Sequence, residues 1–348
     1  MGRQLGRHLA TRVEPAPDAE PPRAREPRVR ASRATAPRGS ADLAGKPVLV
    51  ARYEKRLRRV THASKILGVA KSFHVYLPDG TLTARGKRYP VLYFFRGHED
   101  EWVNPRQDHS RQRRTVIDAY EEQLRLGRVG PMVLVFPGIA SDDNVVSGLL
   151  VNMRDPKRAG RHGGVGTGRF EDYFVKELIP LVETSYPVKK GGAHRGAIGF
   201  SLGGLMTAKI ALQHPGLLTT VGAYDGTFIW HDPQDDRTLR NHIFDAGFGV
   251  PRDFEFIEKN SPMHLLERVK TAELERMRFF VEFGPESAEP NDSNFYRGRE
   301  FLRRLVKRGG RNTGGVVPEG RHNWATADGH VTRTLAAHYS ALDHAAVR

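Results

Sequence analysis

Apolar runs alternate with amphipathic segments over most of the chain after residue 70. Residues 89–95 and 132–136 are continuously apolar, which is typical of strands that are buried on both faces of a sheet. Strands that alternate with helices predict an α/β fold with a mainly parallel central sheet of about eight strands and helices on both faces. The predicted strands are 71–77, 89–95, 132–136, 196–200, 218–224, 278–283 and 314–317, and the predicted helices are 115–126, 170–186, 205–213, 294–307 and 325–342.

Two segments fall outside this alternation. Residues 1–46 are rich in Arg, Pro and Ala and contain no aromatic residue, so they are expected to form a disordered basic tail. Residues 47–348 then form one catalytic domain. Within this domain, residues from about 227 to 262 lack a regular period and are expected to form a loop or a small cap beside the active face.

Composition excludes several classes of chemistry. The 348 residues include no cysteine, which rules out disulfides, thiolate metal sites and a cysteine nucleophile. The formal net charge of +15 is interpreted as an arginine-rich solvated surface. The only macromolecular partner expected from this charge is a polyanion that the tail binds weakly and without specificity. No apolar stretch is long enough to span a membrane, and no secretory signal precedes the domain, so a cytoplasmic location is expected.

The sequence G-F-S-L-G at residues 199–203 is the strongest chemical signal. It lies between a predicted strand and a predicted helix, and the glycines two residues before and after Ser201 permit a sharp turn. Such a turn raises a serine hydroxyl above the sheet as a nucleophile. The backbone N–H of Leu202 then faces the group that Ser201 attacks.

A serine nucleophile needs a base and an acid that orients the base. His322 lies between the last short strand and the last helix, which is where the base is expected. Three carboxylates after the strand 278–283 compete for the role of the acid. Asp292 is favoured, and Glu286 and then Glu289 are the alternatives.

The loop after the strand 89–95 is expected to complete the oxyanion hole. Gly97 lets the backbone approach the substrate, and the N–H of His98 is the candidate donor beside that of Leu202. A metal site at His98, Glu99 and His109 fits no ligand spacing, and the glycine-rich residues 161–168 lack the ending of a phosphate-binding loop, so no metal and no cofactor are expected. Three tryptophans are candidates for lining the pocket: Trp102, Trp230 and Trp324.

Several motifs together resemble the esterase D superfamily of α/β-hydrolases, which includes feruloyl esterases, enterochelin esterases, S-formylglutathione hydrolases and mycolyltransferases. They cover residues 48–345, although Arg96 stands where the superfamily usually has histidine. The similar segments are Y-P-V-L-Y at 89–93 with R-G at 96–97 and Trp102, E-L-I-P at 177–180, Y-P-V at 186–188, I-G-F-S-L-G-G at 198–204, H-P at 214–215, N-S-P at 260–262, N-D-S at 291–293, and Gly320 with His322 and Trp324.

The resemblance implies an α/β-hydrolase fold and a serine esterase that acts on a small-molecule carboxylic ester through an acyl-enzyme. The same residues also suit an acyltransferase, in which an alcohol rather than water resolves the acyl-enzyme. A non-catalytic binding protein of the same fold is the remaining alternative, and the presence of a candidate for each catalytic role argues against it.

Overall fold

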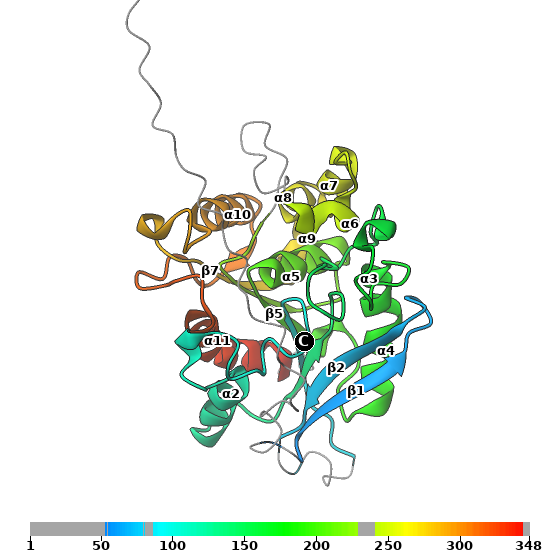
Figure 1. Ribbon diagram of the computed structural model, residues 1–348. Helices are drawn as coiled ribbons and strands as arrows, with labels where there is room; N and C mark the ends of the chain where they lie inside the picture. Colours follow the sequence, from blue (N-terminus) through cyan, green and yellow to red (C-terminus); the bar gives the residue numbers. More distant parts are fainter. Residues whose placement is uncertain (1–52, 54, 79, 81–85, 229–240, 344–348) are drawn as a thin grey trace, which may run out of the picture. The chain divides into compact units, whose positions relative to one another are not determined.

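An eight-stranded sheet forms the centre of the described part of the chain, which comprises residues 53, 55–78, 80, 86–228 and 241–343 of a computed structural model (Figure 1). These residues all belong to the compact unit Leu43–Arg348. The strand order is β1-β2-β4-β3-β5-β6-β7-β8; the pairings β1–β2 and β2–β4 are antiparallel and all the others are parallel. The strands are β1 Leu57–Ala63, β2 Ala70–Tyr76, β3 Val91–Phe95, β4 Val133–Pro137, β5 Arg195–Phe200, β6 Thr220–Tyr224, β7 Arg278–Glu282 and β8 Arg311–Asn312.

Helices cover both faces of this sheet, and the alternation of side chains along each strand explains how. In β3, Val91, Tyr93 and Phe95 enter one apolar cluster, whereas Leu92 and Phe94 enter the other. The helices α2 Val116–Arg125 and α11 Trp324–Asp343 pack on the second cluster, on the opposite face from α5 (Figure 1).

The other helices are α3 Phe170–Asp172, the π-helix η3 Tyr173–Leu178, α4 Ile179–Ser185, α5 Leu202–Gln213, α6 Asp245–Phe248, α7 Phe254–Asn260, α8 Pro262–Arg268, α9 Thr271–Leu274 and α10 Phe295–Lys307. Short 3₁₀ turns are η1 His109–Arg111, η2 Pro156–Ala159, η4 Gly192–His194, η5 His242–Phe244 and η6 Glu286–Ala288. Within the described residues, no helix combines the length and the apolar character needed to cross a bilayer.

The predicted fold class is confirmed, and details of the predicted strands are corrected. Strand β1 was not predicted, because six of its seven residues are at least partly exposed and no buried period is visible in its sequence. Residues 314–317 do not form the predicted strand: the last strand is β8, and Val316 makes only an isolated bridge with Phe283. The expected loop or cap at about 227–262 is described at residues 227–228 and 241–262, and the second of these segments folds into short helices that include α6 and α7. The predicted tail lies outside the described residues.

The ends of neighbouring strands are aligned at the carboxyl edge of the sheet. Phe200 at the end of β5 pairs with Tyr224 at the end of β6, which in turn pairs with Glu282 at the end of β7. The residues that directly follow these strands are therefore neighbours in space, although they are far apart in the sequence.

Candidate active site

Ser201 occupies the sharp turn that the sequence predicts between β5 and α5. Its backbone has φ 56° and ψ −117°, a conformation that residues other than glycine rarely adopt. A side chain at Gly199 would overlap the backbone of Gly203, and one at Gly203 would overlap the carbonyl group of Phe95. The two glycines are required because the turn brings three backbone segments into contact.

The imidazole of His322 lies between Ser201 and a buried carboxylate. Its Nε2 is 3.1 Å from Ser201 Oγ, and its Nδ1 is 2.5 Å from Asp225 Oδ2. Asp225 directly follows β6 and is fully buried. Its other oxygen, Oδ1, accepts hydrogen bonds from the backbone N–H of Asn294 at 2.9 Å and of Gly284 at 3.2 Å. The carboxylate is thus held in one orientation relative to the imidazole.

This arrangement corrects the predicted partner of the imidazole. Asp292 Oδ1 accepts a hydrogen bond from the backbone N–H of His322 at 3.0 Å, and its Oδ2 lies 3.4 Å from Arg321 Nε. Asp292 therefore supports the loop that carries His322 rather than the imidazole ring.

The two alternative carboxylates also have other partners. Glu286 accepts a hydrogen bond from the hydroxyl of Tyr296 at 2.6 Å, and Glu289 accepts one from the backbone N–H of Tyr296 at 3.1 Å. Burial raises the pKa of Glu289 above its ordinary value. Counting residues back from α10 pointed to the loop after β7, whereas the structure places the carboxylate one strand closer to Ser201. A usable signal was present, because Asp225 directly follows the apolar run at 218–224.

The two predicted oxyanion donors, the N–H groups of Leu202 and His98, lie in different environments. Leu202 is the first residue of α5, so its N–H has no acceptor within the helix and lies at the positive end of the helix dipole. The N–H of His98 instead donates to Glu101 Oε2 at 2.8 Å. A Cβ at Gly97 would stand 2.6 Å from Asn144 Oδ1 and 2.9 Å from the same carboxylate oxygen of Glu101, so a side chain there would displace these two groups.

Two of the three predicted pocket tryptophans, Trp102 and Trp324, belong to the core. Trp102 and Trp324 are buried and pack against each other with ring centroids 5.1 Å apart. Phe200, the residue before Ser201, packs on Trp324 at 5.1 Å and on the ring of His322 at 4.8 Å. These aromatic contacts fix the position of the imidazole. Trp230 lies outside the described residues.

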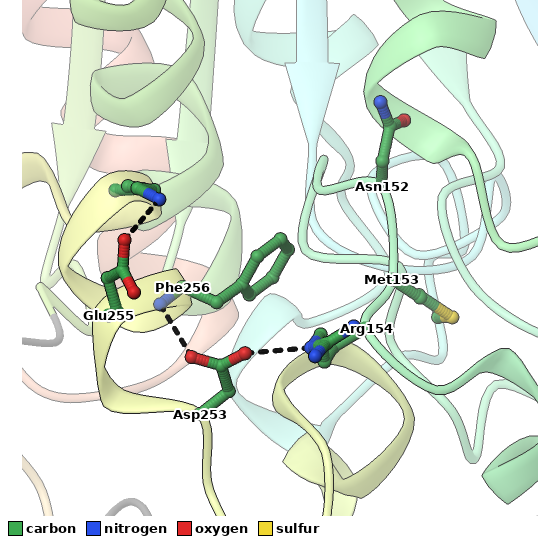
Figure 2. Close-up of a pocket in the computed structure, with 7 residues that line it drawn as sticks. Asn152, Met153, Arg154, Asp253, Glu255 and Phe256 are labelled. Carbon is green, nitrogen blue, oxygen red and sulfur yellow. Dashed lines mark hydrogen bonds and ion pairs between the residues drawn. The ribbon is translucent and has the colours of Figure 1, made fainter.

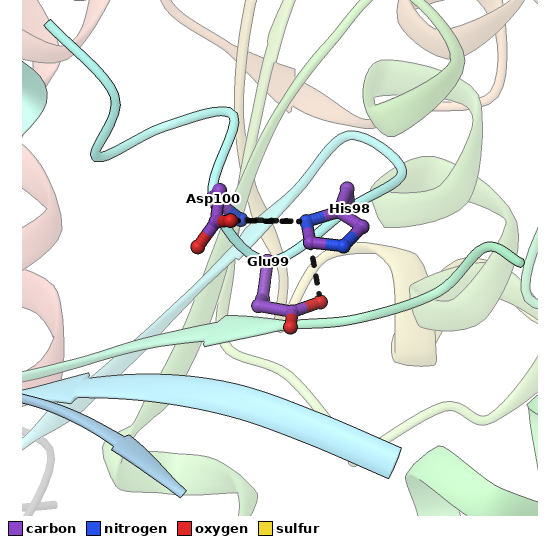
Figure 3. Close-up of side chains that lie close together, drawn as sticks. All are labelled: His98, Glu99 and Asp100. Carbon is purple, nitrogen blue, oxygen red and sulfur yellow. Dashed lines mark hydrogen bonds and ion pairs between the residues drawn. The ribbon is translucent and has the colours of Figure 1, made fainter. Parts of the chain in front are cut away.

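His98, Glu99 and Asp100 form a cluster of possible metal ligands in the loop after β3, shown in Figure 3. The polar groups of this cluster have protein partners. Arg59 pairs with Glu99 at 2.8 Å, His74 contacts Asp100 at 2.6 Å, and the N–H of Asp100 donates to His98 Nδ1 at 3.2 Å. His109 lies apart from the cluster, in η1. We therefore assign these side chains to the support of the loop.

A surface pocket of about 260 Å³ lies elsewhere, between α7 and the segment 152–154 (Figure 2). Two ion pairs border it, Arg154 with Asp253 at 2.7 Å and Lys259 with Glu255 at 2.5 Å. Its lining consists of Asn152, Met153, Arg154, Asp253, Glu255, Phe256 and Lys259, and includes none of the three residues of the Ser201 site.

Comparisons with known proteins identify the family of the chain. Residues 64–326 match the model of the Esterase family, which carries the description "Putative esterase". The uncharacterized protein YbbA of Bacillus subtilis (strain 168) is 27% identical over 210 residues, which are 58% of this chain and 75% of that protein.

Two solved structures share the α/β-hydrolase fold with this chain. A ferulic acid esterase superposes with a TM-score of 0.64 at 19% identity, and the superposition covers 82% of this chain and 98% of the esterase chain. An S-formylglutathione hydrolase from Agrobacterium tumefaciens superposes with a TM-score of 0.60 at 15% identity, covering 82% of this chain and 95% of its own.

Proposed function

Because the chain belongs to the esterase family that its residues 64–326 match, we propose that Ser201, His322 and Asp225 form the catalytic triad with which it hydrolyses carboxylic esters. The observation that carries the proposal is the continuous line of contacts from Ser201 Oγ through the imidazole of His322 to the buried Asp225. A hydroxyl, an imidazole and a carboxylate in this order supply the nucleophile, the base and the group that orients the base.

The reaction would proceed in two halves through an acyl-enzyme. His322 Nε2 accepts the proton of Ser201 as Oγ attacks the ester carbonyl carbon, and Asp225 stabilises the imidazolium that forms. The N–H of Leu202 donates to the oxyanion of the tetrahedral intermediate. The imidazolium then protonates the leaving alcohol, and the C–O bond of the ester breaks.

The second half repeats these steps with water. His322 takes a proton from water as the water oxygen attacks the acyl carbon, and the second tetrahedral intermediate collapses. Ser201 recovers its proton, and the carboxylic acid leaves. Ser201 is 6% exposed and the His322 side chain is 28% exposed. The reacting carbonyl would therefore reach the serine along the imidazole. This narrow access suits a small ester.

The test is covalent labelling of the nucleophile combined with turnover. A fluorophosphonate probe is expected to modify Ser201, located by peptide mass spectrometry, and 4-nitrophenyl butyrate to be hydrolysed by the same protein. Ser201→Ala should abolish both signals, whereas Ser287→Ala, at an exposed serine in the loop after β7, serves as the matched control. Labelling at another residue, or turnover by Ser201→Ala within about tenfold of the wild type, would overturn the proposal.

Product analysis distinguishes hydrolysis from acyl transfer. With a short alcohol present, a hydrolase should release mainly butyrate. Predominant formation of the butyrate ester of that alcohol would assign the second half-reaction to an acyltransferase.

A further inference from the structure

Arg96 lies directly beside the nucleophile turn. Phe95, the last residue of β3, pairs with Gly199 of β5, so Arg96, which follows β3, lies next to Phe200, which precedes Ser201. The close approach is also seen from α5, because a Cβ on Gly203 would stand 3.1 Å from the Cα of Arg96. The backbone of Arg96 therefore lies close to the end of β5 and to the start of α5, the two elements that the turn at Ser201 connects.

The guanidinium and the proposed base pack on the same ring. Cζ of Arg96 lies 5.6 Å from the centroid of the Phe200 ring, and the His322 ring lies 4.8 Å from that centroid. Phe200 belongs to the apolar cluster on the face of the sheet that α2 and α11 cover. Arg96 and His322 therefore both pack on the residue that precedes Ser201.

Hydrogen-bond donors of this guanidinium remain available. Among the described residues, no acceptor lies within hydrogen-bond distance of its buried Nε, and the nearest carboxylate oxygen, Glu101 Oε1, is 4.0 Å away. The other oxygen of Glu101 already accepts the N–H of His98. About a quarter of the Arg96 side chain (24%) is exposed, so a small molecule at the site has access to it.

Two neighbouring arginines are engaged differently. Arg111 makes two hydrogen bonds of 2.8 Å to Asp328 and also donates to three backbone carbonyls. Arg321, next to His322, lies 3.4 Å from Asp292 and donates to the carbonyl of Gly320 at 3.1 Å. A guanidinium has five N–H donors in a planar geometry that matches a carboxylate. Of these three arginines, only Arg96 makes no hydrogen bond to the described residues, and its carboxylate contact, with Glu101, is 4.0 Å long.

We propose that Arg96 binds an anionic group in the alcohol part of the ester, so that the preferred substrates are esters of small carboxylate-bearing alcohols or phenols. This inference rests on the proposed function, in which the imidazolium of His322 protonates the leaving alcohol and the alcohol part consequently lies on the His322 side of Ser201. A charge-assisted hydrogen bond at this position favours a carboxylate over a neutral amide by about 10- to 100-fold.

The experiment compares two esters of equal shape, 3-acetoxybenzoate and 3-acetoxybenzamide. The measured quantity is the ratio of their kcat/KM values. Arg96→Met should lower this ratio at least tenfold relative to the wild type, and Arg96→Lys should recover part of it, because the charge remains while the planar fork is lost. Arg321→Met is the matched control, and its ratio should stay within about threefold of the wild type, as expected for an exposed, paired arginine.

The outcomes separate this inference from the proposed function. Hydrolysis that persists in Ser201→Ala would contradict the proposed triad. An unchanged ratio in an Arg96→Met enzyme that still depends on Ser201 would contradict only the role of Arg96, as would an equal loss in Arg321→Met. A loss confined to an anionic acyl group, measured with 4-nitrophenyl hemisuccinate against 4-nitrophenyl butyrate, would overturn the assignment to the alcohol part.

A second measurement needs no variant. In the wild type, raising the ionic strength should lower kcat/KM for 3-acetoxybenzoate and leave that for the benzamide nearly constant, because salt screens the attraction between the guanidinium and the carboxylate. Equal salt dependence for both esters would count against the proposal even if the Arg96 variants did not fold.

Discussion

The carboxylate of Asp225 lies next to His322 because of the strand that precedes it. The N–H of Asp225 donates to the carbonyl of Glu282 in β7 at 2.7 Å, and the N–H of Ser201 donates to the carbonyl of Tyr224 in β6 at 3.1 Å. The ends of β5, β6 and β7 are therefore connected by hydrogen bonds directly beneath the reacting groups. The same register that builds the sheet sets the distance between Ser201 and Asp225.

Exchanging the acid for its amide tests this assignment. Asp225→Asn should lower kcat for 4-nitrophenyl butyrate by about 10⁴-fold, because an amide does not stabilise imidazolium and favours the wrong tautomer. Asp292→Asn should have a much smaller effect, since an amide oxygen still accepts the backbone N–H of His322. An Asp292→Asn enzyme as slow as Asp225→Asn would return the acid to the loop after β7.

The sequence predicts only those parts of the candidate site that depend on residues close together in the chain. The glycines around Ser201 and the place of His322 before the last helix are local features, and the structure brings the two side chains together. The acid depends on which strands are neighbours, and the spacing to α10 gives no information about that. The partner of the His98 N–H was also not predictable, because the Glu101 side chain folds back onto the loop.

Helices α10 and α11 each contain a glycine, and the packing of the two glycines differs. A Cβ at Gly298 of α10 would overlap the ring of Phe283, which belongs to the core. A Cβ at Gly329 of α11 would meet only the flexible end of Arg333, at 3.2 Å. The first glycine permits close packing, whereas the second only weakens its helix.

The same substitution should therefore have opposite effects at these two positions. Gly329→Ala is expected to stabilise the protein by about 0.5–1 kcal/mol, because alanine reduces the conformational entropy of the unfolded chain. Gly298→Ala should destabilise it by about 1–3 kcal/mol through overpacking. Urea unfolding of both variants measures the difference. A stabilised Gly298→Ala protein would show that α10 shifts easily on the sheet.

Elements with a strong period were predicted well, and elements without one were not. The buried strands β3 to β7 appear in the sequence as apolar runs, whereas β1 carries mostly exposed side chains and β8 has two residues. The single helix predicted at 170–186 is divided into α3, the π-helix η3 and α4. Pro180 at the start of α4 has no N–H, so an α-helical hydrogen bond is missing at the point where the π-helix ends.

At the scale of the whole molecule, Glu282 joins the sheet to the last helix. From the end of β7 it accepts a hydrogen bond from His330 at 2.9 Å and several from Arg333 of α11. Burial alone would raise the pKa of Glu282, but the hydrogen bonds from His330 and Arg333 lower it to about 2. The ionised carboxylate therefore favours the folded state.

This pairing predicts a dependence of stability on pH. Because the pKa is lower in the folded state than in the unfolded chain, the contribution of Glu282 is present above about pH 4.5 and is lost as the pH falls toward 2. Glu282→Gln should lower the free energy of unfolding at pH 7 by about 2–3 kcal/mol and flatten its decline across that window. Thermal unfolding measured from pH 7 to pH 2 tests both effects. If stability falls with pH in Glu282→Gln as steeply as in the wild type, other groups cause the loss of stability in acid.

Residues 1–46 are predicted to be dispensable for the chemistry. Their sequence has no apolar pattern that would pack on a core, so the truncated protein should keep its Tm and its turnover of 4-nitrophenyl butyrate. Binding to a polyanion such as heparin should weaken on truncation and with rising salt, because the arginines of this segment would provide the attraction. A truncated protein that unfolds or loses turnover would show that the segment contributes to the domain.

The strained backbone of Ser201 sets stability against activity. Glycine adopts φ 56° and ψ −117° without penalty, so Ser201→Gly should be inactive and yet unfold at a higher temperature than the wild type, by relief of about 1–3 kcal/mol of strain. An unchanged or lower Tm would show that the turn is not a site of strain. Directed evolution for heat resistance alone would therefore favour the loss of Ser201. Evolution of a heat-resistant enzyme would need to select for turnover in every round.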